Sequence, residues 1–156
     1  MNYNKNDDFL KEENRDGYIV SPLMKKVWSV ELDLLSELDR VCKKYDIKYY
    51  AAFGTLLGAV RNKGFIPWDD DIDVCMLRDD YARLKEVAKD EFSGKYYYQD
   101  WYNSCGRTWI FSKLRNSETT AIEYPDKPEE FNQGIFIDIF PIDCLLYTSD
   151  AADELD

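Results

Sequence analysis

The sequence predicts an α/β (or α+β) fold in which helices flank a mixed β-sheet. The chain has 156 residues, of which 45% are hydrophobic, so it can bury the core of one domain. A long helical pattern is followed by short β-prone runs that alternate with two further helical patterns, and several strand-like runs fill the second half. Neither an internal repeat nor a domain linker interrupts this order.

The first predicted element is an amphipathic helix. Ser21 is suited to cap its N-terminus and Pro22 to occupy its first position. Apolar residues then recur every three or four positions and define one buried face, at Leu23, Val27, Val30, Leu34, Leu38, Val41 and Tyr45. Charged residues, Glu31 among them, are assigned to the opposite, solvent-facing side. The preceding residues 1–20 are polar and are expected to form a flexible lead-in with a short strand over 18–20.

Turn-forming and β-prone residues delimit the later elements. Gly54 separates a β-prone run from a short apolar helix, and Asp79 or Asp80 can cap a third helix. Pro141 is expected to end the last strand. The predicted strands cover residues 47–53, 71–76, 95–101, 109–114, 119–123 and 134–140, and the two later helices cover 55–61 and 79–89.

Composition excludes several classes of function. The net charge of −11 disfavours non-specific nucleic-acid binding, although a phosphate ligand can still bind if a cation lies between the two negative partners. The absence of histidine excludes a Ser-His-Asp triad, a Cys-His dyad and a His-ligated zinc. The four cysteines lie about thirty residues apart without a C-x-x-C pair, which argues against a zinc site and a disulfide framework. They are interpreted as reduced, mostly buried thiols.

The sequence carries no recognisable signal peptide or transmembrane segment. Its N-terminus lacks an apolar run, and no stretch approaches the roughly 18 apolar residues that would span a bilayer. A cytoplasmic location is therefore predicted.

Alternating acids in an apolar strand are the most informative feature. Asp71 and Asp73 lie two positions apart, so on a strand they point to one face while Ile72 and Val74 point to the other. Two close carboxylates repel each other unless a proton or a cation lies between them, and a hard divalent ion such as Mg²⁺ suits oxygen ligands. Asp138 lies in a similar apolar strand. If that strand is a neighbour, Asp138 supplies a third metal ligand or a general base.

A complementary, phosphate-binding pattern precedes these acids. Gly54 and Thr55 lie between a predicted strand and a predicted helix, where backbone N–H groups point toward an anion and glycine allows a phosphate to come close. Arg61 and Lys63 follow, and their charge suits phosphate oxygens.

Other interpretations of the acids remain open. Residues 69–73 could form a solvated acidic turn, although unpaired charge entering an apolar strand is costly. They could also be the D-x-D metal site of a sugar-nucleotide glycosyltransferase. An EF-hand calcium loop does not fit, because it needs glycine where Val74 stands and glutamate where Asp80 stands. Asp138 alone could be a polar residue at a strand end.

At these residues the sequence resembles the LicD family, the bacterial phosphocholine transferases and their relatives, to which the fukutin-related proteins are similar. The resemblance covers roughly residues 22–143. It is carried by GTLLGAVR over 54–61, GFIPWDDDIDV over 64–74, FSKLR over 111–115 and GIFIDIFPID over 134–143. Family members often have histidine where Asn62 stands, and asparagine cannot titrate near neutrality, so no proton-transfer role is expected there.

The resemblance implies a nucleotidyltransferase-like fold, in which the alternating acids hold Mg²⁺ and the Gly-Thr segment lies at the donor phosphates. Carried over by position, the catalytic and metal-binding residues are Asp71, Asp73 and Asp138. The candidate ligands of the donor phosphates are Gly54, Thr55, Arg61 and Lys113.

The family also implies an activity: transfer of phosphocholine or a similar phospho-substituent from a CDP-choline-like donor to a glycan or lipid-linked glycan, as in lipopolysaccharide or teichoic acid. A lipid-linked acceptor would place the enzyme near the inner membrane face. Two alternatives remain open, a nucleotidyltransferase that releases pyrophosphate and a non-catalytic truncated fragment. The second arises because residues 144–156 do not resemble the family, so residues 21–143 are expected to form an incomplete family domain before a non-family tail.

Overall fold

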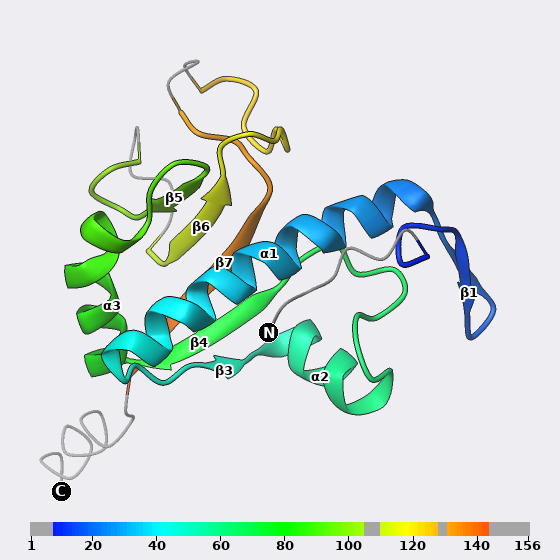
Figure 1. The fold of residues 1–156 in the computed structure, drawn as a ribbon, viewed down its shortest axis with the longest axis horizontal. Coiled ribbons are helices and arrows are strands. Elements are labelled where there is room, and N and C mark those ends of the chain that lie inside the picture. The colour runs from blue at the N-terminus through cyan, green and yellow to red at the C-terminus, as the bar shows by residue number, and fades with distance from the viewer. Residues whose placement is uncertain (1–7, 105–109, 128–130, 144–156) are drawn as a thin grey trace, which may run out of the picture.

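The computed structural model describes residues 8–104, 110–127 and 131–143. In these residues, helices pack on a five-stranded mixed sheet (Figure 1), which confirms the predicted fold class. The expected tail, residues 144–156, and the predicted strand start at residue 109 lie outside the described residues. The helices are α1 (Pro22–Tyr45), α2 (Phe53–Arg61) and α3 (Arg78–Glu91). The strands are β1 (Glu13–Arg15), β2 (Tyr18–Val20), β3 (Tyr50–Ala51), β4 (Asp73–Leu77), β5 (Tyr96–Gln99), β6 (Ser112–Asn116) and β7 (Phe136–Ile142).

The strand order of the main sheet is β3-β4-β7-β6-β5. β4 and β7 run parallel, whereas every other pair of neighbours in this sheet is antiparallel. The two strands that were predicted to carry acids are therefore adjacent inside the sheet. Asp73 of β4 lies opposite Asp138 of β7 in their register.

α1 lies across one face of this sheet (Figure 1). Its start is the predicted one, because the Ser21 hydroxyl accepts a hydrogen bond from the Met24 backbone N–H at 3.2 Å. It ends at Tyr45, and the C-cap residue Asp46 takes the left-handed conformation with φ 51°. The second half of α1 packs on the core face of the sheet through Leu34, Leu38, Val41 and Cys42, which meet Val74, Met76, Ile137 and Ile139.

The buried face of the first half of α1 differs from the predicted one. Leu23 is 72% exposed, whereas Glu31 is only 1% exposed. The buried stripe runs through Lys25, Trp28, Glu31, Leu34, Leu38 and Val41. Lys25 and Glu31 can be buried in this half of α1 because it packs against polar neighbours. Lys25, for example, forms an ion pair with Glu13 of β1.

Residues 13–20, within the predicted lead-in, form a β-hairpin. β2 covers the predicted strand, and β1 pairs with it antiparallel. The two-residue connection is Asp16 and Gly17, with φ 51° and 87°. An Asp-Gly pair favours this turn, because both residues tolerate left-handed backbone. That dipeptide is the signal from which the hairpin could have been predicted.

Three smaller predictions of local structure were wrong. α3 begins at Arg78 after Leu77, which makes no side-chain cap in the described structure, so Asp79 and Asp80 lie in the first turn rather than capping it. Residues 119–123, all of them described, form no strand. Pro141 does not end β7 but lies inside it.

Pro141 is tolerated because of where its nitrogen points. The Asp138 backbone N–H donates to the Ile72 carbonyl at 2.9 Å, on the β4 side of β7. Since backbone groups alternate along a strand, the Pro141 nitrogen points to the β6 side. Among the described residues, pairing with β6 ends at the Ser112–Ile139 pair, so proline removes no hydrogen bond between these strands.

Among the four cysteines, Cys42 and Cys75 are buried free thiols, as predicted. Cys105 and Cys144 lie outside the described residues.

Candidate functional site

The acidic loop, residues 69–73, leads into β4 beneath the first half of α1. Ile72 is buried, while Asp71 and Asp73 are partly exposed. The Trp28 indole N–H of α1 donates to the Asp69 carbonyl at 2.8 Å, and the Trp28 ring stacks on Phe65 with centroids 4.5 Å apart. The loop is therefore attached to α1 by a directional bond.

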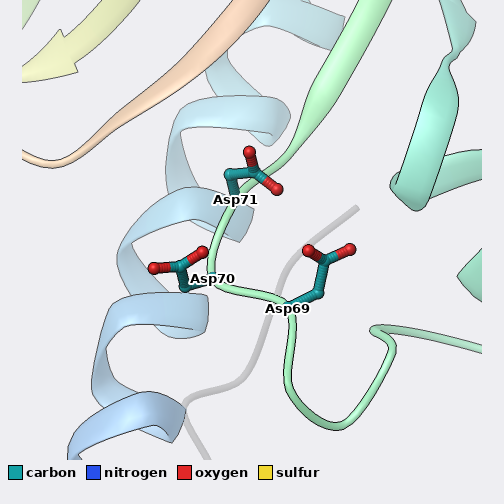
Figure 2. Close-up of side chains that lie close together, drawn as sticks. All are labelled: Asp69, Asp70 and Asp71. Carbon is teal, nitrogen blue, oxygen red and sulfur yellow. The ribbon is translucent and has the colours of Figure 1, made fainter.

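The carboxylates of Asp69, Asp70 and Asp71 form a compact group (Figure 2). One oxygen from each lies within 4.8 Å of the others. Figure 2 shows Asp69 and Asp70 on opposite sides of the loop, with α1 behind Asp70. Of the predicted metal ligands, only Asp71 belongs to this group, and Asp69 and Asp70 are additions that the sequence argument did not assign.

Asp73 and Asp138 join the cluster from β4 and β7. They are opposite each other in register, and the charge of each acts on its acidic neighbours. Burial, then the charges of Asp69, Asp70 and Asp138, raise the pKa of Asp71 to about 6. Burial, then Asp71, Asp138 and Asp69, raise the pKa of Asp73 to about 7. The structure thus brings the three predicted acids together, in a site with an excess of negative charge.

Lys113 of β6 faces the third acid. It lies opposite Asp138 in register, and its ammonium is 2.8 Å from a carboxylate oxygen of Asp138. The same ammonium lies 3.5 Å from Glu123 and 3.3 Å from the Phe136 ring centroid. Burial raises the pKa of Asp138, and the Lys113 charge opposes that rise. Lys113 is therefore placed at the acidic cluster, where its proposed contact with a phosphate stays a prediction.

The N-terminus of α2 closes another side of the cluster. A Cβ on Gly54 would lie 2.5 Å from a carboxylate oxygen of Asp69, so any larger residue would displace that carboxylate. The Thr55 hydroxyl accepts the Asp73 backbone N–H at 2.8 Å. Ala52 precedes the helix and makes no side-chain cap among the described residues. The positive end of the α2 dipole thus lies beside the acids, and binding of a donor phosphate by Gly54 and Thr55 stays a prediction.

Arg61 is not brought to this cluster. It lies at the opposite end of α2 from Gly54, about 10 Å along the axis at 1.5 Å per residue. Its side chain is exposed, and its Nε donates to Asn62 at 2.9 Å.

Glu31 is the site residue that the sequence argument missed. Burial, then the charges of Asp71, Asp70, Asp69 and Asp73, raise the pKa of Glu31 to about 9. A signal for its position existed, because Glu31 lies three residues before Leu34 and three after Trp28, in phase with the buried stripe.

A cleft of about 560 Å³ opens beside the cluster. Glu31, Asp70 and Asp71 line one wall, and residues 120–123 line another. The cleft is large enough for part of a nucleotide-sized ligand. These three acids are therefore placed where a ligand in the cleft could reach them.

The donor set fits a hard divalent cation such as Mg²⁺. Every candidate ligand is a carboxylate oxygen, the chemistry such ions prefer. The raised pKa values of Asp71 and Asp73 show that the folded chain resists holding these charges together without a proton or cation. The residues therefore suit the ion that the sequence resemblance implies.

None of the helices in the described residues has the length and apolar character required to cross a membrane.

Three relatives share sequence with this chain. It is 54% identical over 56 residues to "Lipopolysaccharide cholinephosphotransferase LicD" of Haemophilus influenzae, covering 36% of the chain and 21% of that protein. It is 34% identical over 130 residues to "Uncharacterized protein RP689" of Rickettsia prowazekii, covering 78% and 48%. It is 30% identical over 104 residues to "Uncharacterized protein RT0683" of Rickettsia typhi, covering 63% and 33%. The chain thus spans less than half the length of each relative.

A family model described as "LicD/FKTN/FKRP, nucleotidyltransferase domain" matches residues 46–150. This match includes the acidic loop, α2, β6 and β7, and it covers more than half of the chain. The chain therefore belongs to the LicD/FKTN/FKRP nucleotidyltransferase-domain family.

Proposed function

We propose that this protein is a Mg²⁺-dependent phosphotransferase that moves a phospho-substituent from a nucleotide donor to a hydroxyl of a glycan. One observation carries the proposal: the acids of β4, β7 and the acidic loop converge beside the N-terminus of α2, in a chain of the LicD family. This arrangement combines cation ligands with backbone donors for phosphate.

In the proposed site, Asp71, Asp73 and Asp138 hold the cation. Bound Mg²⁺ would neutralise the donor phosphates and the leaving oxygen. Gly54 and Thr55 present the first-turn N–H groups of α2 to the same phosphates. Because Asp138 is the acid paired with a buried ammonium, it remains charged more readily than an isolated buried carboxyl would, which suits a cation ligand or a base toward the acceptor hydroxyl.

The name of one relative supports a finer substrate assignment. The Haemophilus influenzae protein is named a lipopolysaccharide cholinephosphotransferase. We therefore propose a CDP-choline-like donor and, as acceptor, a glycan or lipid-linked glycan of lipopolysaccharide or teichoic acid. We place the reaction in the cytoplasm, at the inner membrane face if the acceptor is carried on a lipid.

A second reaction is favoured by the description of the family model as a nucleotidyltransferase domain. Transfer of the nucleotidyl group from a nucleoside triphosphate would release pyrophosphate, whereas transfer of phosphocholine from CDP-choline would release CMP. The two reactions use the same cation and the same donor cradle, so product analysis separates them.

The first experiment compares thermal stability with and without Mg²⁺ and CDP-choline. A ligand that binds only the folded state adds about 2.7 kcal/mol at one hundred times its Kd. The wild type should show a Mg²⁺-dependent shift, and the Asp71→Asn/Asp73→Asn variant should lose it. Asp90→Asn, an exposed aspartate on α3, is the matched control and should behave as wild type. Full activity in Asp71→Asn would refute the proposal, and CMP release with a glycan acceptor would support it.

A further inference from the structure

Glu31 is a buried acid, and no hydrogen bond or ion pair among the described residues accounts for the burial of its Oε2 atom. Its carboxyl oxygen Oε2 is fully buried and has no hydrogen-bond partner among the residues that the structure describes. The buried cation of α1, Lys25, is instead paired with Glu13. A buried carboxyl that gains nothing from its surroundings costs stability.

The surroundings of this carboxyl are acidic. The charges of Asp71, Asp70, Asp69 and Asp73 all act on it. Glu31 also lines the cleft of about 560 Å³ together with Asp70 and Asp71. Its side chain therefore points from α1 into the acidic cluster, and not into the apolar core beneath Leu34.

We propose that Glu31 is a further ligand of the divalent cation, contributed by α1 to the site formed by the acidic loop, β4 and β7. A cation satisfies the orphaned oxygen and the surrounding aspartates at once, which no proton on a single carboxyl can do. The consequence is structural as well as catalytic. Cation binding joins α1 to the acidic loop, in addition to the bond from Trp28 to the Asp69 carbonyl.

This inference rests on the proposed function, since it assumes the same cation. The decisive variant is Glu31→Gln, which keeps the side-chain shape and cannot ionise to bind a cation. Mn²⁺ binding is measured by calorimetry and by the thermal shift that it produces. We expect the Mn²⁺ affinity to fall at least about tenfold, while the metal-free melting temperature stays equal or rises, because glutamine, unlike Glu31, needs no added proton to be buried there.

A matched control and a second readout make this specific. Glu86→Gln makes the same substitution at an exposed position on α3 and should bind Mn²⁺ as the wild type does. Hydrogen exchange over residues 28–35 of α1 should slow when Mn²⁺ binds to the wild type, and this protection should be lost in Glu31→Gln. If Glu31 had only a structural role, Glu31→Gln would instead lower the metal-free melting temperature and leave the Mn²⁺ affinity unchanged.

The outcomes separate this inference from the proposed function. If the wild type and Glu31→Gln bind Mn²⁺ equally while Asp71→Asn/Asp73→Asn does not, the role of Glu31 is refuted and the cation site stands. If the wild type binds no Mn²⁺ with or without CDP-choline, both fail. If Glu31→Gln does not fold, Glu31→Asp decides: its carboxylate is withdrawn by one methylene, so a weakened affinity supports the ligand role and an unchanged one refutes it.

Discussion

At the scale of single residues, Gly54 controls the position of an acid through the space that it leaves. A Cβ there would lie 2.5 Å from the Asp69 carboxylate, so Gly54→Ala must push that side chain away. Alanine favours a helix by up to about 1 kcal/mol over glycine, and we therefore expect little loss of stability. Cation affinity should nevertheless fall. The measurement is a Mn²⁺ titration of the melting temperature.

Gly64→Ala is the control for this change. A Cβ at Gly64 would make only an ordinary 3.6 Å contact with Arg15, so cation affinity should not change. Equal affinities in both alanine variants would show that the position of Asp69 is irrelevant to the site.

Lys113 is the second residue at which a single change is informative. It is 3% exposed and pairs with Asp138, which is 8% exposed. Removing one partner of a buried pair leaves an uncompensated charge, and such changes cost about 3–5 kcal/mol. Lys113→Met should lose stability of this order in urea unfolding. Lys113→Met/Asp138→Asn should recover part of it, and no recovery would mean that the loss came from packing alone.

At the scale of elements, the contact between β6 and the start of β7 tolerates no side chain at Gly134. An added Cβ would overlap the Asn116 carbonyl oxygen and lie 2.8 Å from its carbon. The clash is with backbone, so the two strands must separate. Overpacking of this kind costs about 1–3 kcal/mol. Gly134→Ala should lower the free energy of unfolding accordingly, whereas an unchanged value would show that this loop moves without disturbing the strands.

The elements also show what the sequence could predict. The start of α1 could be predicted because the capping preference of Ser21 and the fixed φ of Pro22 act locally. The alternation of apolar residues around Asp73 and Asp138 predicted two apolar strands that each carry an acid. The adjacency of those strands was only conditional. It depends on long-range pairing, which no local pattern encodes.

The positions of Glu31 and Pro141 were not predicted from local sequence patterns. Hydrophobicity alone assigned Glu31 to solvent, because the periodic template counts apolar residues and cannot recognise a polar residue that faces a polar cluster. Pro141 was taken as a strand end, although its effect depends on whether a neighbour needs its missing N–H at that position. In both cases the tertiary partner decided the outcome.

At the scale of the whole molecule, the acidic cluster should make stability depend on pH in opposite ways with and without a cation. The pKa values of Asp71 and Asp73 are raised from 3.8 to about 6 and about 7. At pH values between the unfolded pKa of 3.8 and these folded pKa values, the folded chain holds protons that the unfolded chain has released. The contribution of the cluster to stability is therefore present below about pH 4 and is lost as pH rises through 6 and 7.

Comparison with Asp71→Asn/Asp73→Asn isolates this contribution from the rest of a chain with net charge −11. Asparagine imitates the neutral acid, so in EDTA the variant should gain stability relative to the wild type between pH 5 and pH 8. With saturating Mn²⁺ the order should reverse, because the cation replaces the protons and binds the ionised wild type more tightly as pH rises. Melting curves of both proteins at the two pH values, with and without Mn²⁺, check this. A difference in EDTA that does not change with pH would mean that solvent already screens the acids, and the cluster would then have no electrostatic need of a cation.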